Sequence, residues 1–171
     1  MTQVKTAGLW NESLWDYANR VYAHQEVESL VLDMQDEYYA NVDIILWCCW
    51  LDSEGIPLSC EVLDDILISV DTVSQSTLLK IRDVRRYLKK AGSFTPTQSK
   101  VITKQLLNAE LVIEKVLLYR MQDLTRRFAI VMRDEQAPLS LRYYLEFLGI
   151  PDAPQLARMV QTACKLRSSY C

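Results

Sequence analysis

The longest helical pattern in this chain is longer than a compact domain of its size can enclose. It begins at Thr95-Pro96-Thr97-Gln98, a capping box with proline at the first helical position, and runs without glycine or proline to about residue 133. A helix over 96–133 has about 38 residues and a length of about 57 Å, whereas a globular domain of 171 residues is about 40 Å across.

Within this pattern the apolar residues recur at steps of three and four, with one additional four-residue step between Ile113 and Leu117. They are Ile102, Leu106, Ala109, Ile113, Leu117, Met121, Leu124, Phe128 and Val131. We therefore expect the helix to bend, to break near Asn108 or near the additional step, or to project from the domain and pack on a partner.

The rest of the chain also repeats its apolar residues with a period near 3.6. The segment DIILWCCWL is apolar on nearly all sides, which indicates a buried core helix over 42–53. Further helices are expected over about 12–22 (Asn11 as N-cap), 27–38, 60–70, 76–91, 140–148 and 152–167. In the helix over 76–91 we expect these residues to face inward: Leu78, Leu79, Ile81, Val84, Tyr87 and Leu88. The sequence predicts one all-α domain over 1–171, a bundle of seven or eight helices.

The net charge of −3 conceals a division along the chain. Residues 1–71 hold 14 acidic residues and two basic ones, a formal charge of −12, and residues 72–171 carry +9. The domain is therefore expected to contain acidic helices over 11–71, a basic helical hairpin over 76–133 and C-terminal helices over 140–167. The chain is 50% hydrophobic, which excludes a disordered protein. No apolar run reaches the roughly 18 residues of a membrane span, and we expect a cytoplasmic protein that does not bind membranes.

The densest basic cluster lies on the predicted helix over 76–91 and consists of Arg82, Arg85, Arg86, Lys89 and Lys90. It could neutralise the phosphates of a nucleic acid, or it could dock on the acidic part of the same chain. Glu110 and Glu114 form a like-charge pair one helical turn apart, close to the apolar stripe. We expect them to find arginine or lysine partners on a neighbouring helix.

Residue types typical of catalysis and metal binding are sparse. His24 is the single histidine, and the five cysteines form no C-x-x-C pair, so we expect no metal and no cofactor. We interpret His24 as a residue at the C-terminal end of the first helix. Acidic residues lie three apart at Asp33 and Asp36, and an enzyme using Asp33, Asp36 and Asp43 remains an alternative if these carboxylates converge on one pocket.

The stretch LWDYANRVYAHQEVESLVLDMQDEYYANVDIILWCCWL, with IRDVRRYLK and AELVIEK further on, resembles an uncharacterised proteobacterial family, domain-of-unknown-function family 2390. The residues that carry the resemblance are Leu14, Trp15, Tyr22, Val27, Leu32, Gln35, Asp36, Val42, Asp43 and Trp50. The chain departs from the family pattern at Tyr39, near an expected glycine, and at Asp43, where asparagine is usual. It also lacks a tryptophan near Gln75. The resemblance implies a bacterial, cytoplasmic, helical protein with a small polar group of Gln35, Asp36 and Asp43 beside the core helix.

These features favour a non-catalytic binding or adaptor protein that acts through protein–protein contacts, with another protein or a second copy of itself as partner. The first alternative is a nucleic-acid- or ribosome-associated protein that uses the basic helix over 82–90. The second is the small-molecule or metal-dependent enzyme that uses Asp33, Asp36 and Asp43. The candidate binding residues are Gln35, Asp36, Asp43, Arg82, Arg85, Arg86, Lys89, Lys90, Glu110 and Glu114.

Overall fold

The computed structural model describes residues 8–129 and 138–165, and these residues form eight helices without any strand. The helices are α1 (Leu14–Tyr22), α2 (Gln25–Tyr38), α3 (Val42–Glu54), α4 (Cys60–Ser76), α5 (Leu78–Lys90), α6 (Pro96–Ala129), α7 (Ser140–Phe147) and α8 (Ala153–Lys165). The predicted all-α class is confirmed. The predicted ends of two helices, at 130–133 and 166–167, lie outside the described residues.

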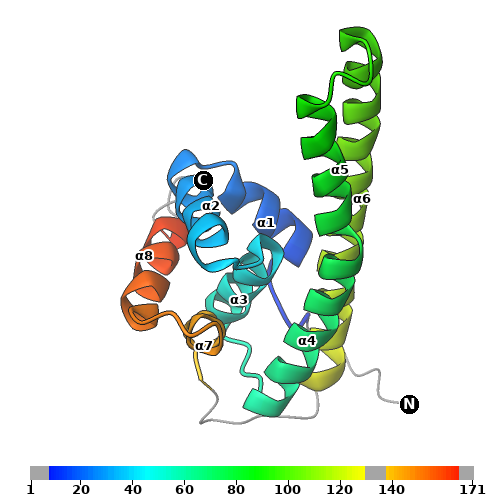
Figure 1. Ribbon diagram of the computed structural model, residues 1–171. Coiled ribbons are helices and arrows are strands. Elements are labelled where there is room, and N and C mark those ends of the chain that lie inside the picture. The colour runs from blue at the N-terminus through cyan, green and yellow to red at the C-terminus, as the bar shows by residue number, and fades with distance from the viewer. Residues whose placement is uncertain (1–7, 130–137, 166–171) are drawn as a thin grey trace, which may run out of the picture.

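Helix α3 is the centre of the molecule, and α1, α2, α6, α7 and α8 all pack against it (Figure 1). Nine consecutive residues of α3, from Asp43 to Leu51, are buried, and the indole rings of Trp47 and Trp50 have no exposed surface. This confirms the prediction from its all-round apolar sequence. We call the group α1, α2, α3, α7 and α8 the body.

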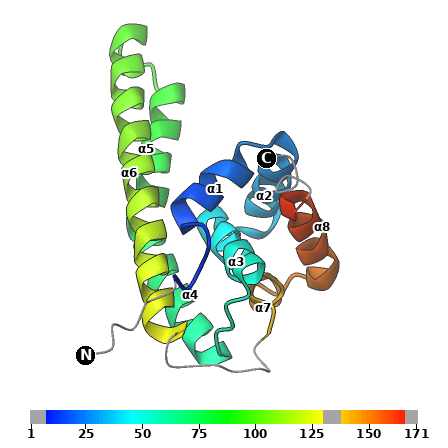
Figure 2. The ribbon, with the colours of Figure 1, turned by 180° about the vertical axis from the view of Figure 1, so that it is seen from behind.

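Helices α5 and α6 form a long hairpin that rises beyond the body along one side (Figures 1 and 2). With 34 residues, α6 is about 51 Å long. Of the expected outcomes for this helix, projection is the one observed, because α6 continues unbroken through Asn108 and through the additional step. Apart from Glu110, its buried residues lie in its second half, between Leu117 and Thr125, where the body covers it.

The helix ends follow local hydrogen bonding. In the predicted capping box, Thr95 N–H donates to Gln98 Oε1 (3.0 Å) and Gln98 N–H donates to Thr95 Oγ1 (3.3 Å). The prediction that Asn11 caps α1 is wrong: Ser13 does so, with its Oγ accepting from Asp16 N–H (3.1 Å). Asn11 instead donates from its backbone and side chain to Glu54.

One other expectation is incomplete and one is wrong. His24 follows the C-cap of α1 and donates its backbone N–H to Val21 O (3.2 Å), but it also occupies the N-cap position of α2, which was not expected. On α5, Val84 and Tyr87 are 49% and 60% exposed rather than inward. The apolar band of α5 is wider than the single helix, α6, that covers it along the hairpin, and these two residues fall outside the contact.

Candidate functional site

A cavity of about 510 Å³ lies where the acidic helices of the body meet the basic hairpin. Its walls come from α1, α2, α3, the end of α4, α5 and α6. Eight of the ten predicted binding residues line it: Gln35, Asp36, Asp43, Arg82, Arg85, Arg86, Glu110 and Glu114. We call this cavity the body–hairpin pocket.

The other walls of the pocket are apolar, aromatic or neutral. The apolar lining includes Val42, Leu46, Leu78, Leu111 and Leu118. Trp15 adds an indole ring that stacks on Tyr119 with 6.4 Å between ring centroids. No sequence pattern indicates Trp15, Asn19, Tyr22 or Ser74 as lining residues, because their role depends on how the hairpin packs over α1 and α4.

An ion-pair network joins α5 to α6 at the back of the pocket. Arg85 Nε lies 2.8 Å from Glu110 Oε1, and Arg82 Nη2 lies 2.8 Å from Glu114 Oε1. Arg82 Nε approaches Glu110 Oε2 at 3.5 Å. The predicted partners for both glutamates are therefore present. The side chain of Glu110 is only 7% exposed, and two guanidinium groups compensate its charge.

Asp43 is the buried carboxylate of the pocket that this network does not satisfy. Only 9% of its surface is exposed, and within the described residues its carboxylate has no hydrogen bond or ion pair. Burial raises its pKa to about 7, with the nearby Glu114 raising it further and Arg82 lowering it. Asp43 is thus a buried acid that titrates near neutral pH.

Asn41 fixes the position of Asp43 by organising the start of α3. Its side-chain Oδ1 accepts from Asp43 N–H (2.9 Å), and its Nδ2 donates to Ser74 Oγ on α4 (3.1 Å). Its backbone N–H donates to the hydroxyl of Tyr144 on α7 (2.9 Å). Three helices therefore hold the turn that places Asp43 in the pocket wall.

Glu114 faces the same space from α6. Burial raises its pKa, and the ion pair and hydrogen bond with Arg82 act in the opposite direction. The pKa of Tyr22 on α1 is also raised, first by burial and then by Glu28 and Glu114. The pocket therefore combines acids with raised pKa values and arginines that are already engaged.

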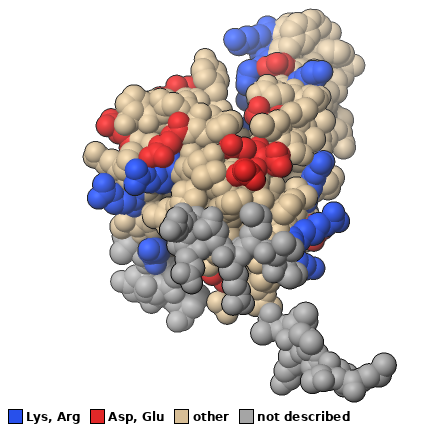
Figure 3. Space-filling model, turned by 90° about the horizontal axis from the view of Figure 1, so that it is seen from below, with Lys and Arg blue, Asp and Glu red and all other residues tan. Residues whose placement is uncertain are grey.

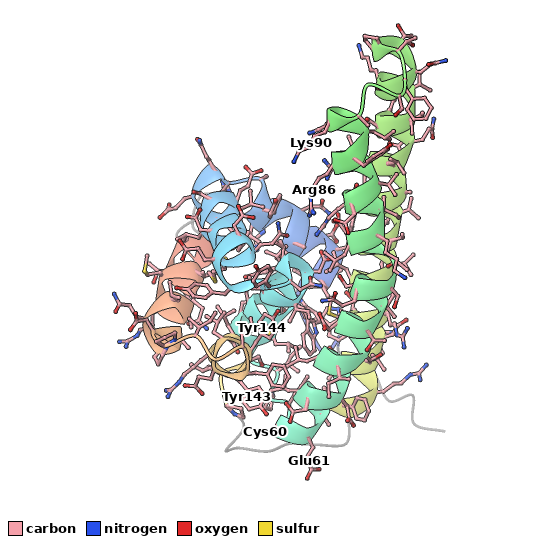
Figure 4. The ribbon with its side chains drawn as sticks, viewed as in Figure 1. Cys60, Glu61, Arg86, Lys90, Tyr143 and Tyr144 are labelled. Atoms are coloured by element: carbon pink, nitrogen blue, oxygen red, sulfur yellow. The ribbon has the colours of Figure 1, made fainter. Side chains whose placement is uncertain are left out.

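The basic cluster of the sequence is divided by the fold. Arg82 and Arg85 turn to the glutamates of α6, whereas Arg86, Lys89 and Lys90 are exposed. Arg86 pairs with the exposed Asp83 at 2.7 Å. Figure 4 shows Arg86 and Lys90 on the side of α5 that faces the body, with Lys90 nearer the free end of the hairpin. Lys89 and Lys90 are the two predicted residues that do not line the pocket.

Seen from below, acidic side chains gather near the middle of the lower face and basic ones lie toward its margins (Figure 3).

In the part of the chain that the structure describes, no group of three histidine, cysteine, aspartate or glutamate residues has a metal-binding arrangement. Asp33 is exposed and lies outside the pocket, so Asp33, Asp36 and Asp43 do not converge on it. No helix of the described residues has both the length and the apolar character to cross a bilayer.

Residues 13–121, more than half of the chain, match the model of a protein family described as "Protein of unknown function (DUF2390)". This match runs from the start of α1 to Met121 in α6 and so includes every residue that lines the pocket. No curated protein and no solved structure matches the chain.

Proposed function

The chain belongs to the DUF2390 family of unknown function, and we propose that it is a non-catalytic binding protein of the bacterial cytoplasm that holds a partner protein at the body–hairpin pocket. The observation that carries this proposal is the convergence of eight predicted residues on one cavity around a buried carboxylate, Asp43, that has no hydrogen bond or ion pair within the described residues. Buried polar groups are normally hydrogen-bonded, so an unsatisfied acid in a cavity wall favours a ligand that completes it.

Exposed apolar residues along the hairpin support a polypeptide as the partner. Leu111 lines the pocket and is 55% exposed. Leu107 precedes it by one helical turn, toward the free end, and is 47% exposed. A partner segment that enters the pocket and continues along α6 would cover both leucines, and removing apolar surface from water is favourable.

A second copy of the chain is one form that this partner could take. Val112 and Val116, one helical turn apart, are 62% and 60% exposed. They lie on a different side of α6 from Leu107 and Leu111, because neighbouring residues on a helix are about 100° apart. Light scattering in solution distinguishes a stable dimer from a monomer that binds another protein.

Site-specific photo-cross-linking in cells of the source organism tests the partner proposal. A photoreactive phenylalanine analogue replaces Leu107 in one variant and Ile68 in the control, since Ile68 is 58% exposed on α4 and does not line the pocket. The expected result is a discrete adduct with a polypeptide from position 107 and none from position 68. Absence of an adduct at 107, or equal adducts at both positions, contradicts the proposal.

Nucleic-acid association is the second candidate, and the exposure of Arg86, Lys89 and Lys90 favours it. It is weaker than the sequence alone indicates, because the α6 glutamates engage Arg82 and Arg85. Binding of RNA or DNA by these residues should weaken linearly in log–log plots against salt concentration. The candidate fails if a gel-shift assay at low salt shows no complex, or if the double variant Lys89→Ala, Lys90→Ala binds as strongly as the unmodified chain.

A further inference from the structure

The charges of the body–hairpin pocket do not balance once its internal pairs are formed. Four carboxylates and three guanidinium groups line it. Arg82 and Arg85 pair with Glu114 and Glu110, and Arg86 pairs with Asp83 outside the lining set. Asp36 and Asp43 are left without a hydrogen bond or an ion pair in the described residues, so the unmatched charge of the pocket is negative.

The burial of Asp43 decides which of these two acids would anchor a ligand. Asp36 is exposed, and water can solvate its charge. Asp43 is 9% exposed, and its carboxylate oxygens keep a small accessible surface. A carboxylate that has lost most of its hydration and has no donor within the described residues is unfavourable. Its four acceptor sites suit a donor that carries positive charge, because a charge-assisted hydrogen bond is stronger than a neutral one.

The remaining walls define what should carry that cation. Val42 and Leu46 follow Asp43 on α3, Leu78 comes from α5 and Leu118 from α6. The ring of Trp15, which already has Lys115 Nζ at 4.7 Å from its centroid, adds an aromatic face. These surfaces fit an aliphatic stem, and about 510 Å³ is within the usual range for a small-ligand pocket.

We infer that the body–hairpin pocket is a binding site for an alkylammonium or alkylguanidinium group, with Asp43 as its counter-ion and the apolar walls holding its stem. In the context of the proposed function, on which this inference rests, the group is a lysine or arginine side chain of the partner protein. Free amines and guanidines share this chemistry and serve as probes.

Binding of such a cation should depend on pH. The charged or titratable groups that line the pocket with Asp43 are Tyr22 on α1, Asp36 on α2, Arg82, Arg85 and Arg86 on α5, and Glu110 and Glu114 on α6. Since the pKa of Asp43 is about 7, its ionised fraction rises about tenfold between pH 6 and pH 8. Alkylamines and alkylguanidines remain protonated over this range, so their affinity should rise by up to about tenfold, the limit set by the ionisation of Asp43 alone.

Titration of the full chain with n-butylguanidine, n-butylamine and n-butanol tests the inference. Binding is followed by chemical-shift changes of the backbone amides in ¹H–¹⁵N correlation spectra. Asp43→Asn is the test variant, and Asp33→Asn is a control outside the pocket. We expect both cations, but not butanol, to shift the amide signals of α3 and α6 saturably. The affinity should fall about tenfold or more in Asp43→Asn and change less than twofold in Asp33→Asn.

Each outcome bears on the inference. It is overturned if the cations bind no better than butanol, or if Asp43→Asn binds them as the unmodified chain does. If Asp43→Asn does not fold, the unmodified chain decides, because affinity that is constant from pH 6 to pH 8 overturns the inference and affinity that rises supports it. If the cations do not bind but position 107 gives a specific adduct, the partner-protein proposal stands and the partner does not insert a cation into the pocket. If the cations bind but position 107 gives no adduct, the partner-protein proposal is wrong and the cation-binding inference still stands.

Discussion

Trp47 Nε1 on α3 donates a hydrogen bond of 2.9 Å to Thr125 Oγ1 on α6, and both side chains are fully buried. The threonine hydroxyl in turn donates to Met121 O at 2.8 Å. The core tryptophan of the body is thereby linked to the base of the hairpin. A second link is the backbone N–H of Leu14, which donates to Gln122 Oε1 at 2.7 Å. These two bonds, one turn apart on α6, set the position from which the hairpin projects.

Replacing Thr125 with valine should lower the free energy of unfolding by about 1–3 kcal/mol, because it leaves the buried indole N–H without an acceptor at nearly unchanged volume. Urea titration followed by circular dichroism measures the change. Thr72→Val is the matched control: the exposed Thr72 makes the same bond to the carbonyl four residues earlier, at 2.8 Å. It should change stability by less than about 0.5 kcal/mol. Equal effects of the two variants contradict this account.

The ion pairs between α5 and α6 give a second prediction. Arg85→Gln removes the main partner of Glu110, whose side chain is 7% exposed. We expect a loss of about 1–3 kcal/mol in the free energy of unfolding, less than for a fully isolated pair, because Arg82 remains nearby. Arg86→Gln, on the same helix, breaks a pair whose side chains are 64% and 67% exposed, so it should cost less than about 0.5 kcal/mol. Chemical denaturation of both variants checks the difference, and a larger loss in Arg86→Gln contradicts it.

Much of this network could be predicted from the sequence because its residues lie on two helices that follow each other directly in the chain. Glu110 and Glu114 are one helical turn apart beside an apolar stripe, and an antiparallel basic helix directly precedes them in the chain. Buried like charges require counter-ions, and the hairpin connection brings the arginines of α5 opposite. The core helix was predictable for a similar reason, since a segment that is apolar on all sides must be covered on all sides.

The features that the sequence could not predict depend on which surfaces meet. Whether Asp43 has a partner is decided by the approach of α6 to α3, across about 70 residues of chain, and by Arg82 pairing with Glu114 instead. Val84 and Tyr87 fit the helical apolar period of α5, but no second helix among the described residues covers them. The pocket role of Trp15 depends on how far the hairpin leans over α1, and no periodicity in either segment encodes that distance.

The turn after α2 gives a third prediction. Tyr39 has a φ of 57°, the left-handed conformation, and its side chain is 90% exposed. A residue with a Cβ atom pays about 1 kcal/mol in this region, whereas glycine does not. Tyr39→Gly should therefore raise the free energy of unfolding by about 0.5–1 kcal/mol in thermal or urea denaturation. Tyr39→Ala keeps the Cβ atom and should give no such gain; a gain equal to that of glycine contradicts backbone strain as the cause.

The last prediction concerns the stability cost of the buried acid. Folding raises the pKa of Asp43 to about 7 from about 3.9 in the unfolded chain. Between these values the folded protein binds more protons than the unfolded chain. The contribution of Asp43 to the free energy of unfolding therefore falls as the pH rises from about 4 to 7, by at most about 4 kcal/mol, and is constant above 7. This loss is the expected consequence of holding an acid in the pocket without a partner.

Asp43→Asn removes the titration while keeping the size and shape of the side chain. The raised pKa values of Asp52 and Glu114 change stability with pH in the same direction, but they are common to both proteins and largely cancel in the difference. We expect the variant to gain stability relative to the unmodified chain as the pH rises from 4 to 8, by about 1–4 kcal/mol. Urea denaturation at pH 4, 6 and 8 measures the difference. A difference that does not change with pH would show that Asp43 is ionised at no cost and has a partner in solution.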